Sequence, residues 1–166
     1  RQMCIRDSTE LVQNGWIGGA GGPMGPDPRE LAESDLIIVW GGNPVSTQVN
    51  VMAHISRARK ERGAKLVVID AYQSPTAEVA DDVLLVQPGT DGAVACAIMH
   101  VLFRDGFADE PYMEKYTDNW RELKEHLQDK TPVWAEKISG VSCQKIEALA
   151  RKIGKTERTY IRIGYG

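Results

Sequence analysis

The feature that most restricts the fold of this chain is a threefold alternation of apolar runs, glycine- or proline-rich turns and helical segments. The apolar runs have the length and β-branched content of buried strands, and they lie at residues 36–40, 64–69 and 83–86. The helical patterns that follow them lie at residues 46–63, 76–80 and 91–104. A fourth strand is expected from residue 158, after a mainly helical stretch. The alternation predicts an α/β fold, with a Rossmann-like parallel sheet and flanking helices.

Capping residues set the expected ends of two of these helices. Ser46 or Thr47 is expected to N-cap the first long helix, and Gly63 to end it in the left-handed conformation that glycine adopts at low cost. Ser142 is the expected N-cap of the last helix, with Gly154 just beyond its end. Both ends of each of these two helices therefore have a predicted capping residue.

Charge and cysteine spacing exclude several classes of protein. The chain has 20 Lys+Arg against 23 Asp+Glu, a net charge of -3, so it lacks the basic excess that binding to a phosphate backbone requires, and we expect no nucleic-acid partner. Its apolar runs are too short to span a bilayer. Its three cysteines are widely spaced and its three histidines stand alone. We therefore assign no catalytic residue and no metal ligand within the chain.

Both ends of the chain look unlike those of a natural domain. Residues 1–8 have neither an initiator Met nor the pattern of a signal peptide, and we interpret them as a non-native leader. Residues 15–28 are rich in Gly and Pro and form an expected long loop that could fold over a ligand. We expect residues 9–166 to form a domain that is truncated at both ends, and we leave its compartment unassigned.

The first predicted strand ends in residues suited to binding a nucleotide. In open parallel sheets, ligands bind outside the carboxyl ends of the strands. Here the strand ends at Trp40 and continues as Gly41, Gly42, Asn43 and Pro44. Two glycines allow a ligand to approach the backbone, and the next helix offers N–H groups to a phosphate. The same residues also form ordinary strand-to-helix turns, which composition alone favours.

The second and third strands also end in polar residues. Asp70 follows the second strand, where dinucleotide folds commonly place a carboxylate that accepts from ribose hydroxyls; the alternative is that Asp70 caps a helix or a turn. Gly89, Thr90 and Asp91 follow the third strand. A carboxylate at Asp91 could accept from the two adjacent N–H groups of a guanine edge, or it could cap the helix that begins there. Neither the G-x-G-x-x-G fingerprint after a strand nor a P-loop occurs, which disfavours NAD binding and excludes a P-loop ATPase.

Several ordered blocks resemble the molybdopterin oxidoreductases of the dimethyl sulfoxide reductase family. They are G-P-D-P-R-E-L-A-E-S-D-L-I-I-V-W-G-G-N-P, K-L-V-V-I-D, T-A-E-V-A-D, Q-P-G-T-D-G-A and S-G-V-S-C-Q-K-I-E-A-L-A-R, with I-G-Y-G at the end. The resemblance covers residues 9–166 in matching order, and the order of several blocks is more specific than any one block. It implies one dinucleotide-binding α/β domain of a larger multidomain molybdoenzyme.

The resemblance also implies a cofactor, bis-molybdopterin guanine dinucleotide with molybdenum or tungsten. The loop residues would then be cofactor-binding residues: Trp40, Gly41, Gly42, Asn43 and Pro44 in the first loop, Asp70, Ala71, Tyr72 and Gln73 in the second, and Gly89, Thr90 and Asp91 near a guanine. The family often has Pro and Arg soon after the second-strand Asp, whereas this chain has Ala71, Tyr72 and Gln73. An arginine contact to a phosphate is therefore not expected in the second loop.

What the resemblance implies for the rest of the protein lies outside the chain. The metal ligand and any iron–sulfur cluster belong upstream, and the expected partners are the remainder of the same enzyme, a small-molecule substrate and electron-transfer subunits. The chain alone is expected to be inactive. The alternative is a non-catalytic scaffold of an electron-transfer complex, with the same fold and no pterin. The first and third loops favour the enzyme, because a scaffold has no reason to keep a guanine-reading carboxylate.

Overall fold

The computed structural model describes residues 26–164 of the chain. The expectations about the leader, Cys4 and most of the glycine-rich loop lie outside the described residues. The chain divides into two compact units. The first unit runs to Val83 and resumes at Arg158, and the second unit runs from Leu84 to Glu157. Each unit is described by itself below.

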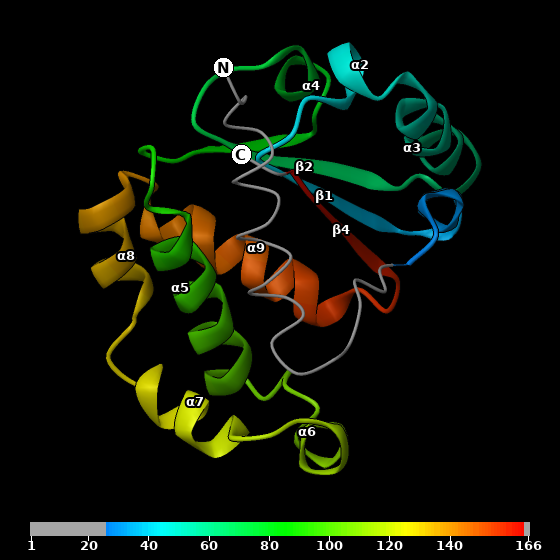
Figure 1. Ribbon diagram of the computed structural model, residues 1–166. Helices are drawn as coiled ribbons and strands as arrows, with labels where there is room; N and C mark the ends of the chain where they lie inside the picture. The colour runs from blue at the N-terminus through cyan, green and yellow to red at the C-terminus, as the bar shows by residue number, and fades with distance from the viewer. Residues whose placement is uncertain (1–25, 165–166) are drawn as a thin grey trace, which may run out of the picture. The chain divides into compact units, whose positions relative to one another are not determined.

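Four strands form one sheet, and its labelled strands lie side by side in Figure 1. They are β1 (Leu36–Trp40), β2 (Lys65–Asp70), β3 (Asp82–Leu85) and β4 (Thr159–Ile163), in the order β3-β2-β1-β4. β1 pairs in parallel with β2 and with β4, so that Leu36 lies beside both Lys65 and Thr159. This arrangement confirms the predicted α/β class and the return of the last strand to the sheet.

The helices of the first unit follow the strands as the alternation predicts. They are the 3-10 helix η1 (Pro28–Glu33), α2 (Pro44–Thr47), α3 (Val49–Arg62) and α4 (Pro75–Glu78). α3 buries Val51, Ile55 and Ala58, which share one face of the helix because they recur at helical spacing. They join Ile37 and Val39 of β1 in one hydrophobic core. This packing fixes α3 against the sheet, with its N-terminus close to the end of β1.

The expected N-cap of the long helix was wrong, whereas its end was correctly predicted. Ser46 and Thr47 lie inside α2, and the residue before α3 is Gln48. The physical reason is Pro44, whose fixed φ starts a separate one-turn helix after the loop that follows β1. At the other end, Gly63 has the predicted left-handed backbone, with φ 70°.

The second unit consists mainly of helices. They are α5 (Asp91–Arg104), α6 (Glu110–Tyr116), α7 (Trp120–His126), α8 (Pro132–Ser139) and α9 (Cys143–Lys155). α5, α8 and α9 pack against one another and form the centre of this unit. None of the helices in residues 26–164 has the length and hydropathy of a membrane-spanning segment.

The last helix corrects a second capping prediction. Ser142 is the N-cap residue of α9, as predicted, but Gly154 lies inside the helix, which continues to Lys155. A Cβ atom at Gly154 would lie 2.3 Å from Cγ of Phe107. Gly154 therefore makes room for an aromatic ring, a tertiary reason for a glycine that capping rules do not include.

Candidate functional site

The first loop leaves β1 through two glycines and lies against two other strand ends. Gly41 has φ 61°, a conformation that favours glycine, and its N–H donates to the carbonyl oxygen of Ile69 over 2.8 Å. The N–H of Gly164 donates to the carbonyl oxygen of Trp40 over 2.7 Å. The carboxyl ends of β1, β2 and β4 therefore meet at this loop, which is where an open parallel sheet binds its ligands.

Asn43 connects the first loop to the segment that follows β2. Its Nδ2 donates to Oγ of Ser46 over 3.1 Å, and its Oδ1 accepts from Oγ1 of Thr76 over 2.8 Å. The same Thr76 hydroxyl accepts from the N–H of Val45 over 3.1 Å. Thr76 is fully buried. The side chain of Asn43 is thus engaged within the protein and holds the two loops together.

The second loop combines a buried carboxylate with exposed side chains. Asp70 is 8% exposed, and its Oδ1 accepts from the N–H of Ala71 over 2.7 Å. Tyr72 and Gln73 are exposed. The carboxylate of Asp70 therefore serves as a turn cap in this structure, while the two following side chains are accessible to a ligand.

A cavity of about 250 Å³ opens at the ends of β1 and β4. The described residues that line it are Val39, Gly41, Gly42, Asn43, Pro44, Thr47, Gln48, Arg162, Ile163 and Gly164. Four of the five predicted residues of the first loop belong to this set. The prediction missed the other lining residues, which are Val39, Thr47, Gln48, Arg162, Ile163 and Gly164. Strand alternation places Arg162 on the same face of β4 as the buried Tyr160.

The third loop belongs to the second unit. Gly89 has φ 80°, and Oγ1 of Thr90 donates to the carbonyl oxygen of Gln87 over 2.6 Å. Thr90 occupies the N-cap position of α5, and Asp91 is the first residue of the helix. The interpretation of Asp91 as the cap was therefore wrong by one residue. Its carboxylate lies in the first turn, where a negative charge is favourable.

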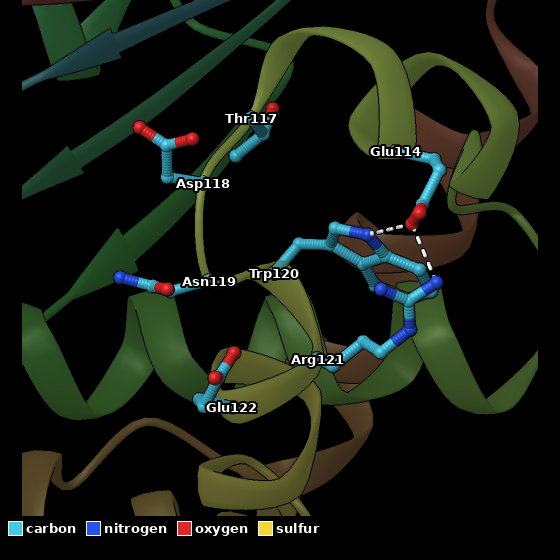
Figure 2. A pocket seen from close by; sticks show the side chains of 7 residues that line it. All are labelled: Glu114, Thr117, Asp118, Asn119, Trp120, Arg121 and Glu122. Carbon is cyan, nitrogen blue, oxygen red and sulfur yellow. Dashed lines mark hydrogen bonds and ion pairs between the residues drawn. The ribbon is translucent and has the colours of Figure 1, made fainter.

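A second hollow, of about 240 Å³, lies between α6 and α7 in the second unit (Figure 2). Oε2 of Glu114 accepts from Nε1 of Trp120 over 2.8 Å and pairs with Nη2 of Arg121 over 2.6 Å. The hydrogen bond from Trp120 and the nearby guanidinium lower the pKa of Glu114. Because these charges are paired with each other, we assign no function to this hollow.

The side chains of Cys143 and His100 interact with other groups of the protein. Cys143 begins α9, and partial burial and a hydrogen bond with Glu136 raise the pKa of its thiol. Nδ1 of His100 lies 2.8 Å from the carbonyl oxygen of Leu127. Within residues 26–164, no group of three or more His, Cys, Asp or Glu side chains could hold a metal ion.

A family model described as molybdopterin oxidoreductase matches residues 8–157. The matched region includes the loops after β1, β2 and β3. The chain belongs to the molybdopterin oxidoreductase family. The resemblance that the ordered sequence blocks indicated is therefore confirmed for almost the whole chain.

Three curated relatives show how much of a longer protein the chain matches. YoaE, a probable oxidoreductase of Bacillus subtilis, is 39% identical over 100% of this chain and 24% of its own length. YnfF, a probable dimethyl sulfoxide reductase chain of Escherichia coli, is 33% identical over 86% of this chain and 20% of its own. Formate dehydrogenase H of Escherichia coli is 30% identical over 87% of this chain and 20% of its own length. The chain thus spans between a fifth and a quarter of the length of these relatives.

A solved structure supports the fold. Acetylene hydratase from Pelobacter acetylenicus superposes with a TM-score of 0.70 over 81% of this chain and 19% of the hydratase chain. The sequences are 23% identical, so the similarity concerns the fold alone. The α/β arrangement of this molybdopterin oxidoreductase chain is therefore also that of a segment within a much longer protein.

Proposed function

We propose that this chain is the cofactor-binding part of a molybdenum or tungsten oxidoreductase that carries bis-molybdopterin guanine dinucleotide. Its role is to position the dinucleotide for oxygen-atom or electron transfer at the metal, while the cofactor supplies the redox chemistry. The observation that carries the proposal is the cavity at the carboxyl ends of β1 and β4, which is lined by Gly41 and Gly42.

The residues around this cavity fit a phosphate-bearing cofactor. Gly41 has open space where a side chain would stand, so a ligand can approach the backbone closely. Arg162 and Gln48 offer donors, and no carboxylate is among the described residues that line the cavity. The set of donors is therefore suited to an anion and not to a bare metal ion.

Each loop has its own part in the proposal. The backbone from Trp40 to Pro44 lies along the cofactor, with Asn43 holding that loop to the next. Asp70, Ala71, Tyr72 and Gln73 form the second binding segment. Gly89 and Thr90 bring the chain to the guanine, and Asp91 accepts from its N1–H and N2–H groups.

The activity as a whole belongs to the longer protein of which this chain spans a part. In the proposal, the remainder of that protein supplies the metal ligand, the substrate site and any iron–sulfur cluster or contact with electron-transfer subunits. The relatives are named for different substrates, including dimethyl sulfoxide and formate. We therefore propose the cofactor and the reaction class without a substrate.

Pterin content tests the proposal against the alternative of a scaffold without cofactor. The longer protein is produced in a host that makes molybdenum cofactor, and pterin and molybdenum are measured per folded polypeptide. The proposal predicts both in fixed ratio to protein. A folded protein without pterin would instead support the scaffold.

Variants of Asp91 test the guanine contact. Asp91→Asn keeps the shape of the side chain but replaces an acceptor with a donor, which should cost about 1–3 kcal/mol of cofactor binding. Asp91→Ala should lower the stability of α5 by only about 0.3–1 kcal/mol, because Asp91 lies in the first turn and Thr90 holds the cap position. Asp91→Asn with full pterin content would show that guanine is bound elsewhere.

A further inference from the structure

Arg162 of β4 reaches the N-terminal end of α3. Tyr160 is buried in the same hydrophobic core as Val51 and Ile55. Arg162 lies two residues further along β4, on the same face of the strand. Nη2 of Arg162 donates to Oε1 of Gln48 over 3.1 Å. Because Gln48 is the N-cap residue of α3, the guanidinium lies at the start of that helix.

Arg162 differs from the other arginines of the first unit. In the described part of that unit, the others each form an ion pair with a carboxylate: Arg29 with Asp27, Arg57 with Glu61, Arg59 with Asp81, and Arg62 and Arg158 with Asp35. Arg162 has the Gln48 amide oxygen as its partner, which uses one of its five N–H donors. Its positive charge is thus not balanced by a carboxylate among the described residues.

The N-terminus of α3 adds to the positive potential around Arg162. The N-terminus of a helix carries a partial positive charge, and the first turn of α3 has no acidic residue to offset it. The cation and the helix end therefore present the same sign of potential to one cavity. An anion in the cavity would be attracted by the guanidinium of Arg162 and by the N-terminus of α3. It would also reduce the repulsion between these two positive charges.

We propose that Arg162 and Gln48, together with the glycine backbone of the first loop, bind a phosphate or diphosphate group. This inference rests on the proposed cofactor function, and it names the part of the ligand that lies in this cavity. It also supplies the arginine contact that the second loop lacks, from a strand at the other end of the sequence. The planar guanidinium suits two oxygens of one phosphate.

Calorimetric titration of the full chain with inorganic pyrophosphate tests the proposal. Wild-type chain should bind it saturably, and Arg162→Gln should weaken the affinity at least about tenfold, since a charge-assisted pair is lost. The matched control is Arg57→Gln on α3, whose arginine is exposed and paired with Glu61. Its affinity for pyrophosphate should equal that of wild type.

One further variant and two further ligands test which group of Arg162 and which part of the ligand determine the affinity. Arg162→Lys keeps the charge without the planar fork, so it should bind more tightly than Arg162→Gln and more weakly than wild type. Titration with GDP and with guanosine distinguishes a nucleotide phosphate from free phosphate, because GDP should bind more tightly than pyrophosphate only where a nucleoside is also held. Circular dichroism confirms that each variant is folded.

Three outcomes would overturn the inference: no saturable binding to wild-type chain, equal affinity in Arg162→Gln, or an equal loss in Arg57→Gln. The failure of the proposed function looks different. If the longer wild-type protein contains pterin and its Arg162→Gln variant is equally loaded, the function stands and the phosphate site fails. If the wild type contains no pterin, the function fails, and the pyrophosphate titration still decides the role of Arg162.

Discussion

At the scale of single residues, the closest backbone approach in the site involves Gly164. A Cβ atom at this position would lie 1.7 Å from the carbonyl oxygen of Gly41, which is far inside contact distance. We predict that Gly164→Ala moves the end of β4 away from the first loop and lowers the free energy of unfolding by roughly 1–3 kcal/mol. Chemical denaturation of the full chain measures this change.

The control for this substitution is Gly92→Ala. Gly92 lies in α5 and has open space where a Cβ atom would stand. Alanine is the better helix former, by about 0.8–1 kcal/mol, so this variant should be as stable as wild type or more stable. Equal stability of Gly164→Ala and wild type would mean that the β4 end does not approach Gly41 in solution.

The buried hydroxyl of Thr76 gives a second prediction at this scale. Thr76→Val keeps the shape but removes the donor to Asn43 and the acceptor for the Val45 N–H. Leaving these groups unpaired should cost on the order of 1–3 kcal/mol of stability. Thr76→Ser keeps both hydrogen bonds and loses one methyl group, so it should cost less. A valine variant that unfolds at the same denaturant concentration as wild type would refute the proposed connection between the loops.

At the scale of elements, Asp35 ties three segments together. Its carboxylate accepts from Arg62 at the end of α3 and from Arg158 just before β4, and it precedes β1 directly. The hydrogen bond from Arg62, with further support from Arg158, lowers the pKa of Asp35 below its ordinary value of 3.8. The native state therefore favours the charged carboxylate more than the unfolded chain does.

The sign of this shift gives a pH dependence. A carboxyl group whose pKa is lowered on folding stabilises the native state above its unfolded pKa, and this contribution is lost as pH falls below 3.8 through the lowered value. We predict that Asp35→Asn flattens the dependence of the unfolding free energy on pH in that range. Arg62→Gln should flatten it in part. Parallel curves for wild type and Asp35→Asn would contradict the assignment.

Local sequence patterns predicted the strands and the long helices α3, α5 and α9, but not all of their ends and not the short helices α2, α6, α7 and α8 as separate elements. The strand at Leu36–Trp40 and the helix at Asp91–Arg104 have the predicted bounds, because burial and apolar periodicity act over the same residues. The split between α2 and α3 was missed because residues Pro44–Thr47 form a separate one-turn helix before α3 begins. The extension of α9 beyond Gly154 was missed because its cause is a ring from another segment.

In the candidate site, too, local sequence patterns predicted some residues, whereas others depend on contacts between distant segments. Residues 40–44 were predicted from one strand end, since a parallel sheet brings such ends to one edge. The contribution of Arg162 depends on the pairing of β4 with β1, in which Arg162 lies beside Val39. Tertiary pairing between distant segments, such as that between Thr76 and Asn43, leaves no local sequence signal.

At the scale of the whole molecule, the chain corresponds to one segment of much longer proteins. The chain belongs to the molybdopterin oxidoreductases and spans 20–24% of the relatives compared with it. The described residues offer loops and an unbalanced positive charge, not a metal centre. We propose that the chain holds the dinucleotide and that the rest of the longer protein carries out the transfer.

The most direct test of that claim is an experimental structure of the longer protein, purified from a host that makes molybdenum cofactor. The account predicts a pterin dinucleotide whose phosphates lie against Gly41 and Gly42, within hydrogen-bonding distance of Arg162. Its guanine should lie at Asp91. A bound dinucleotide that touches neither the first loop nor Asp91, or a folded protein in which these loops contact protein alone, would contradict it.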